Sequence, residues 1–106
     1  MSHSKDTDFT AQHHQDADGN PAGGYAYAKG ISIVWQQGPL EGREQNGAFV
    51  ETLLGICRDR IHYFQSTKFA CAENEATMEA IDQAIAHMKA RTADRQHRGV
   101  EGTHTV

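Results

Sequence analysis

The sequence predicts an α+β fold in which a short N-terminal β region precedes a long antiparallel α-helical hairpin. Residues 25–36 place β-branched and aromatic residues in alternation, which is typical of strands. Two later segments, about 46–65 and 71–98, repeat apolar residues at steps of three and four, which is typical of helices. A chain of 106 residues has room for one small domain.

Residues 1–24 are expected to form a disordered acidic arm that precedes the domain. This segment carries Asp6, Asp8, Asp16 and Asp18 and little apolar surface apart from Phe9. Burial of so little surface does not offset the entropy lost on ordering. The neighbouring residues 13 and 14 are both histidine, but they lack two further ligands at useful spacing, so no metal site is expected.

The β region is expected to be one strand, or two strands joined by a bend at Gly30, within residues 25–36. Glycine and proline then predict a loop over residues 37–45. This loop has no Gly-Lys-Ser/Thr sequence, so it is not a phosphate-binding loop of the P-loop type.

The first helix is predicted to start at Asn46, a favourable N-cap residue, and to end near Gln65. Gly55 lies in its middle, where glycine costs about 1 kcal/mol relative to alanine. A close-packed neighbour or simple tolerance would explain that glycine equally well. The apolar stripe of this helix comprises Phe49, Val50, Leu53, Leu54, Cys57, Ile61 and Phe64.

The second helix is predicted over about residues 71–98, with Gly99 as its C-terminal cap and a polar tail over 99–106. Its apolar stripe comprises Met78, Ile81, Ile85 and Met88. Two helices cannot cover each other's apolar faces completely, and a core this small needs a further source of stability. The two cysteines, Cys57 and Cys71, do not make a disulfide framework and are expected to be reduced and buried. We therefore expect a homo-oligomer held together by these helices.

Composition excludes several partners. Fourteen acidic residues against ten Lys and Arg give a formal charge of −4, which argues against duplex nucleic acid as the main partner. No segment approaches the roughly 18 consecutive apolar residues of a membrane span. The polar start of the chain has no signal-peptide pattern, so we expect a cytoplasmic location and no membrane partner.

Three arginines near the end of the second helix are candidates for phosphate binding. Arg91, Arg95 and Arg98 follow i, i+4, i+7 spacing and therefore project from one helix face. Guanidinium groups at this spacing suit phosphate oxygens. The alternative is a solvated helix end in which Asp94 and Arg98 form an i, i+4 ion pair.

Aromatic and amide side chains near the hairpin tip are candidates for base recognition. Tyr63, Phe64 and Phe69 could stack on a base, or they could cap the core of the hairpin. The amide of Asn74 could bind an adenine edge, or it could satisfy local backbone groups. No set of residues typical of nucleophilic or acid–base catalysis is evident, so we expect neither enzymatic activity nor a cofactor.

Several motifs in residues 25–106 resemble phage proteins of the first Thoeris anti-defence family. They are the segments 30–40 (GISIVWQQGPL), 46–51 (NGAFVE), 69–71 (FAC), 91–95 (RTADR) and 98–104 (RGVEGTH), together with Glu73 and Asn74. The resemblance implies a nucleotide-sponge domain over 25–106 of a phage or prophage protein that acts in the host bacterial cytoplasm. Such proteins bind glycocyclic ADP-ribose signals of Thoeris immunity without cleaving them, and some bind CBASS cyclic oligonucleotides in a separate pocket. The family is hexameric and built from dimers.

The resemblance also implies which residues bind the ligand. Phe64, Asn74, Arg91 and Arg95 match the signal pocket of the family, and with them phosphate recognition becomes the preferred interpretation of the arginines. Arg43 matches a loop arginine implicated in binding cyclic oligonucleotides. The loop over residues 40–46 is shorter than is usual in the family, which places that second pocket in doubt.

Helix geometry constrains how the signal pocket is assembled. Asn74 and Arg91 are 17 positions apart, which is roughly 25 Å along one helix. Cyclic ADP-ribose is much shorter, so a single pocket must lie between two subunits whose second helices are antiparallel. Two other classes of function stay open, namely an oligomeric helical hairpin that binds a protein partner and a hydrolase of nucleotide signals.

Overall fold

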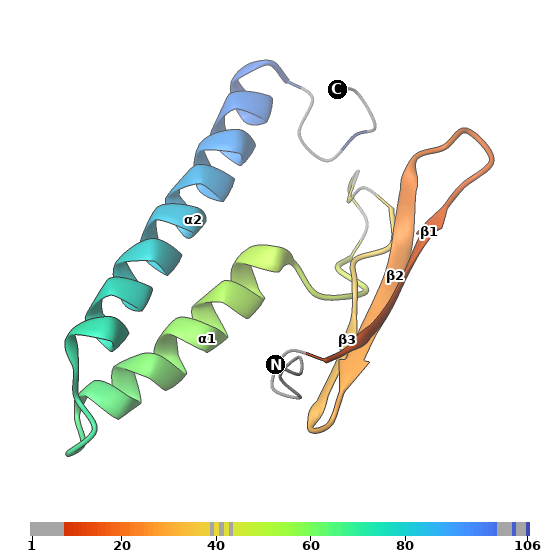
Figure 1. Cartoon of the computed structure of the whole chain (residues 1–106). Coiled ribbons are helices and arrows are strands. Elements are labelled where there is room, and N and C mark those ends of the chain that lie inside the picture. Colours follow the sequence, from red (N-terminus) through yellow and green to blue (C-terminus); the bar gives the residue numbers. More distant parts are fainter. Residues whose placement is uncertain (1–7, 39, 41, 43, 100–102, 104–105) are drawn as a thin grey trace. The chain divides into compact units, whose positions relative to one another are not determined.

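The computed structural model describes residues 8–38, 40, 42, 44–99, 103 and 106. Within these residues the chain forms strands β1 (Thr10–Gln15), β2 (Pro21–Ala28) and β3 (Ile31–Val34), then helices α1 (Val50–Gln65) and α2 (Ala72–His97) (Figure 1). The strands belong to one compact unit, which extends to Ala48, and the helices belong to a second unit, which starts at Phe49. The predicted α+β class with an N-terminal β region is confirmed.

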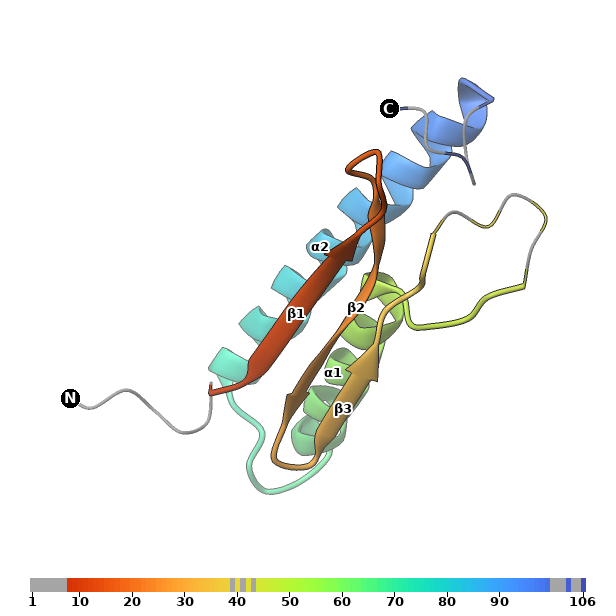
Figure 2. The same cartoon turned by 90° about the vertical axis from the view of Figure 1, so that its right-hand side faces the viewer.

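The first unit is built on an antiparallel sheet in the order β1-β2-β3 (Figure 2). Tyr25 occupies the middle of the sheet, since it pairs with Gln12 on one side and with Val34 on the other. Its hydroxyl donates a hydrogen bond of 2.7 Å to Gln12 Oε1. Its ring stacks with that of Tyr27 at 6.0 Å between ring centroids. The predicted bend at Gly30 is confirmed, because β2 and β3 are joined by a turn at residues 29 and 30.

The expectation of a disordered arm over residues 1–24 is wrong for residues 10–24, and residues 1–7 lie outside the described part of the chain. β1 is exposed along its whole length, so apolar burial does not hold it in place. It is held by the backbone ladder to β2. The turn that joins the two strands is closed by Asp16, whose Oδ1 accepts hydrogen bonds from the backbone N–H groups of Asp18 and Asn20 at 2.9 and 3.0 Å.

Gly24 allows β1 and β2 to approach each other closely. It is the buried residue of β2 and has φ +139°, a conformation that residues with side chains rarely adopt. A Cβ atom at this position would collide with the carbonyl oxygen of Gln12. A side chain here would therefore push the two strands apart.

Helix α1 begins at Val50 rather than at the predicted Asn46, because the Asn46 side chain bonds to the loop instead. Asn46 Oδ1 accepts from the Gln37 backbone N–H at 2.7 Å, and Asn46 Nδ2 donates to the Gln37 carbonyl at 3.2 Å. The N-cap residue is Phe49, which makes no side-chain capping bond. Ala48 pairs instead with Trp35 in an isolated parallel bridge.

The second unit is the predicted antiparallel hairpin of α1 and α2 (Figure 1). The predicted apolar stripe of α2 is its partly buried side, and no side chain of either helix is fully buried.

Gly99 follows α2 with φ +74°, and its N–H donates to the Gln96 carbonyl, so the predicted end of this helix is confirmed. Cys57 and Cys71 are unpaired and exposed in this chain, so their expected burial is wrong here. Cys57 lies on a side of α1 that α2 does not cover, and Cys71 lies in the connection just before α2. Within the described residues, no helix is long and apolar enough to cross a membrane.

Candidate functional site

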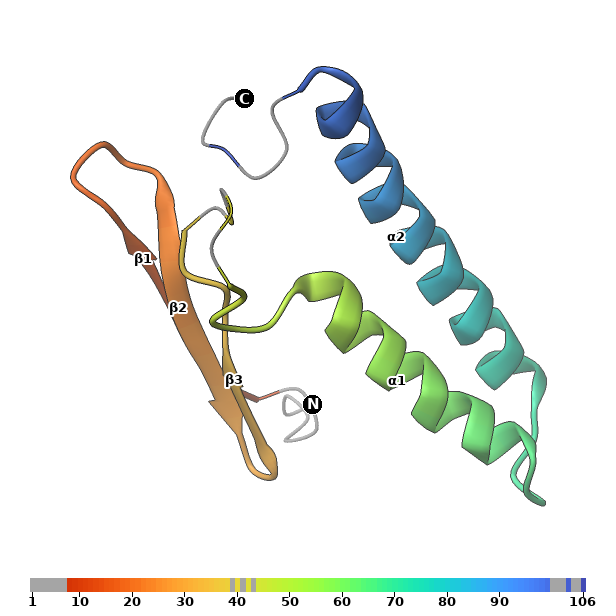
Figure 3. The same ribbon diagram turned by 180° about the vertical axis from the view of Figure 1, so that it is seen from behind.

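An ion pair between Arg58 and Asp82 aligns the two helices. Arg58 Nε lies 2.5 Å from Asp82 Oδ1, and Arg58 Nη2 lies 3.2 Å from Asp82 Oδ2. Because the helices are antiparallel, the first residue of α1, Val50, lies about level with Ala90 of α2. The remainder of α2 extends beyond α1 (Figure 3). We call this projecting segment, residues 91–97, the α2 extension.

The α2 extension carries two of the predicted ligand-binding residues, Arg91 and Arg95. They are one helical turn apart and therefore share a face. Arg91 is exposed and Arg95 is partly buried. Arg98, just after the helix, forms an ion pair with Asp94 at 3.1 Å, so the alternative interpretation of the sequence is confirmed for that pair.

The opposite end of the hairpin carries aromatic rings and cations. We call Arg60, Tyr63, Phe64, Lys68 and Phe69 the hairpin-tip cluster. The Arg60 guanidinium carbon lies 5.0 Å from the Tyr63 ring centroid and 5.1 Å from the Phe64 centroid. Lys68 Nζ lies 5.4 Å from the Phe69 ring centroid. These rings are not buried caps of a core, since Tyr63, Phe64 and Phe69 are 53%, 37% and 69% exposed.

Asn74 lies at the same end of the hairpin and is partly buried. Its Nδ2 donates to Gln65 Oε1 at 3.0 Å and to the Phe69 carbonyl at 3.3 Å. Gln65 Oε1 also accepts from the Cys71 backbone N–H at 2.8 Å. The amide of Asn74 thus satisfies local groups, as one of the two sequence-based alternatives predicted.

The predicted signal-pocket residues fall into two groups within one chain. Phe64 and Asn74 lie at the hairpin tip, whereas Arg91 and Arg95 lie on the α2 extension. Because α2 is continuous from Ala72 to His97, Asn74 and Arg91 are about 25 Å apart along its axis. One chain therefore does not bring the two groups together. Arg43, the predicted residue of a second pocket, lies outside the described residues.

Sequence analysis missed two residues at the tip, Arg60 and Gln65. Arg60 precedes Phe64 by four positions and Tyr63 by three, and this spacing places a cation beside both rings on a helix. That signal was present in the sequence. Gln65 gave no comparable signal, because its bonds depend on the path of the connection between the helices.

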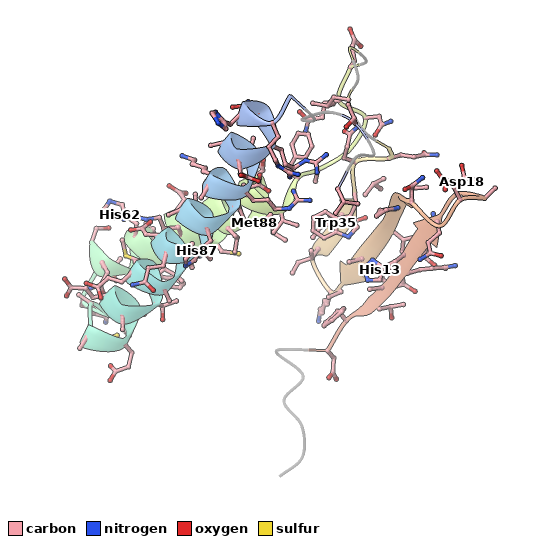
Figure 4. The ribbon with its side chains drawn as sticks, turned by 90° about the horizontal axis from the view of Figure 1, so that it is seen from above. His13, Asp18, Trp35, His62, His87 and Met88 are labelled. Atoms are coloured by element: carbon pink, nitrogen blue, oxygen red, sulfur yellow. The ribbon has the colours of Figure 1, made fainter. Side chains whose placement is uncertain are left out.

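The titratable side chains of the described residues include exposed histidines and an ion-paired aspartate. His13 on β1, His62 on α1 and His87 on α2 are exposed (Figure 4). No group of three or more His, Cys, Asp or Glu among the described residues could hold a metal ion. The hydrogen bond from Arg58 lowers the pKa of Asp82 below its ordinary value. The chemistry that the described groups offer is stacking, hydrogen bonding and binding of anions.

The fold and these surfaces define a class of protein: a small α+β chain whose helical hairpin displays rings and an amide at one end and arginines at the other. The chain is 37% identical over 73 residues to Thoeris anti-defense 1 of Bacillus phage SBSphiJ7. The alignment covers 69% of this chain and 51% of that protein, so the chain spans about half the length of the curated relative it matches. No family model matches the chain. The similarity supports membership of the phage Thoeris anti-defence family, as the sequence motifs predicted.

Proposed function

We propose that this protein counters Thoeris immunity by binding a cyclic nucleotide signal and holding it away from its effector without cleaving it. Glycocyclic ADP-ribose is the foremost ligand, and the host bacterial cytoplasm is where the protein acts. The name of the similar phage protein, Thoeris anti-defense 1, supports the biological role. The family resemblance supports sequestration as the means.

The observation that carries the proposal is that one hairpin displays both kinds of group that a nucleotide needs. An exposed aromatic ring, Phe64, can stack on adenine. The amide of Asn74, at the same end of the hairpin, can hold the edge of the nucleoside. Arg91 and Arg95 can bind the pyrophosphate through paired N–H groups. Arg60 adds positive charge next to the stacking ring.

The separation of the two groups requires a pocket shared between two copies of the chain. Phe64 and Asn74 of one copy would meet Arg91 and Arg95 of another copy whose α2 runs in the opposite direction. We therefore propose a homo-oligomer, built from dimers into a hexamer. Exposed apolar side chains on α1, such as Val50 and Ile56, support further association of the hairpin.

Sequestration requires only affinity and copy number. The protein must bind the signal more tightly than the effector does, and its binding sites must outnumber the signal molecules. Neither a catalytic group, a cofactor nor a metal ion is part of this proposal. CBASS cyclic oligonucleotides are a second ligand class, and Arg43 is the residue proposed to bind them.

A capture-and-release experiment tests the proposal. The purified protein is mixed with glycocyclic ADP-ribose or with a cyclic oligonucleotide and filtered. The retained fraction is then heat-denatured, and all fractions are analysed by chromatography. Sequestration predicts that the ligand disappears from the filtrate and is recovered intact after heating. A new nucleotide species would identify a hydrolase instead.

A second candidate function is binding of a protein partner by the hairpin. The 61% exposure of Ile56, which lies off the apolar stripe of α1, favours it. In the same experiment this function predicts that every nucleotide stays in the filtrate.

A further inference from the structure

Two backbone groups at the hairpin tip determine how the side-chain amides of Gln65 and Asn74 are oriented. A backbone N–H can only donate, so the Gln65 atom that lies 2.8 Å from the Cys71 nitrogen must be the oxygen Oε1. A backbone carbonyl can only accept, so the Asn74 atom that lies 3.3 Å from the Phe69 oxygen must be the nitrogen Nδ2. Each amide is thereby held in one of its two orientations.

The two amides also bond to each other in a consistent way. Gln65 Oε1, already bonded to Cys71, accepts a second hydrogen bond from Asn74 Nδ2 at 3.0 Å. Asn74 Nδ2 thus donates to Gln65 and to Phe69, and these two bonds use both of its hydrogens. The remaining polar atom of the amide is Asn74 Oδ1, which has no hydrogen-bond partner among the described residues. Oδ1 can only accept.

We infer that Gln65 is a positioning residue that, together with the Phe69 carbonyl, makes Asn74 present a hydrogen-bond acceptor, and that the site is thereby specific for adenine over bases with a carbonyl at the same position. This inference rests on the proposed function. The proposed function places a base on Phe64, the residue next to Gln65, with its edge toward Asn74. The exocyclic amine of adenine donates to Oδ1. Hypoxanthine carries an oxygen acceptor in place of that amine, and two acceptors cannot bond to each other.

A first measurement, made without ligand, tests the bridge by hydrogen exchange of the Cys71 amide. Replacement Gln65→Ala should speed this exchange about five- to tenfold, because the bonded acceptor is removed. Replacement Gln65→Glu should keep the wild-type rate, because a carboxylate oxygen accepts from both donors. The Ala70 amide, which bonds to the Thr67 carbonyl, is the internal control and should not change. Equal Cys71 rates in the wild type and in Gln65→Ala would overturn the positioning role.

A second measurement tests base specificity with glycocyclic ADP-ribose and its hypoxanthine analogue. The wild type should bind the adenine compound about tenfold more tightly or better, because the analogue leaves polar groups unpaired. Gln65→Ala should lower the ratio of the two affinities, because only the longer bond to the Phe69 carbonyl then holds the Asn74 amide. Gln65→Glu should keep the wild-type ratio. A purely structural role of Gln65 would lower both affinities together and leave the ratio unchanged, which would overturn the inference.

The two measurements separate the possible failures. If the wild type binds both compounds equally, the inference is wrong and the proposed function stands. If the wild type binds neither compound while Cys71 is protected through Gln65, the proposed function is wrong, and the inferred specificity for adenine is wrong as well. Protection of Cys71 together with a preference for adenine supports both.

Discussion

Arg58 of α1 and Asp82 of α2 are joined by two hydrogen bonds, at 2.5 and 3.2 Å, and this ion pair aligns the hairpin. The alignment has a consequence for the proposed site. Since α1 starts level with about residue 90 of α2, Arg91 and Arg95 lie where no part of α1 covers them. A different register would place these arginines beside α1, where a ligand could not approach them as readily.

The ion pair predicts that the hairpin loses stability in acid. Arg58 lowers the pKa of Asp82 below its ordinary value of 3.8 in the folded state. The stabilisation is therefore complete above the unfolded-state pKa and is lost as the pH falls through the lower folded-state pKa. Circular dichroism melting curves should show this contribution unchanged between pH 7 and 5 and declining below about pH 4.

The variant Asp82→Asn isolates this effect, because its side chain does not titrate. It should be less stable than the wild type at neutral pH, and the difference should shrink in acid. A constant difference from pH 7 to pH 3 would contradict the role of the ion pair.

Arg91→Ala should strongly weaken capture of glycocyclic ADP-ribose. Loss of a charged partner for the pyrophosphate is expected to cost about 2 kcal/mol or more, which is about a 30-fold rise in Kd. Isothermal titration calorimetry measures this change in Kd. Arg98→Ala is the matched control, since Arg98 is an arginine at the same end of the hairpin that pairs with Asp94. Equal effects of the two replacements would indicate a general charge effect instead of a binding site.

Phe64→Ala should weaken binding through the loss of base stacking, by about 1–3 kcal/mol. Phe64→Trp should largely preserve binding, because it keeps a flat ring. Phe9→Ala serves as the control, because it removes an exposed aromatic ring that lies outside the helical hairpin. Wild-type affinity in Phe64→Ala would place the base elsewhere.

A pocket shared between copies predicts complementation of two inactive variants. Asn74→Ala and Arg91→Ala should each bind poorly alone. Unfolded together in equal amounts and refolded, they should regain about a quarter of the wild-type sites, because half of the dimers are mixed and one of the two sites of each mixed dimer has both residues intact. Ligand stoichiometry measures this recovery. A mixture no better than its components would place both residues of a site in one chain.

Gly55 tests whether the exposed side of α1 has a neighbour in the assembly. A Cβ atom at this position meets nothing within 4 Å in the chain. Gly55→Ala should therefore stabilise the helix by about 0.5–1 kcal/mol, seen as a higher Tm. A lower Tm, or loss of the oligomer in analytical ultracentrifugation, would show that another copy packs closely against this glycine.

Local patterns determined much of what sequence analysis could predict. The hairpin helices and the end of α2 at Gly99 follow from helical spacing and from a cap that needs only nearby residues. The Asp94–Arg98 pair is likewise an i, i+4 contact within one turn. Each of these features depends on residues a few positions apart, so the sequence displays them directly.

Tertiary structure alone decided the features that depend on contacts between distant segments. Asn46 has the side chain of a helix cap, yet its bonds go to Gln37, nine positions earlier. β1 has too little apolar surface to be predicted, yet the backbone of β2 pairs with it. The link from Cys71 through Gln65 to Asn74 arises only when the connection between the helices is formed. Such hydrogen bonds produce no periodic pattern in the sequence, because their partners meet only after the chain has folded.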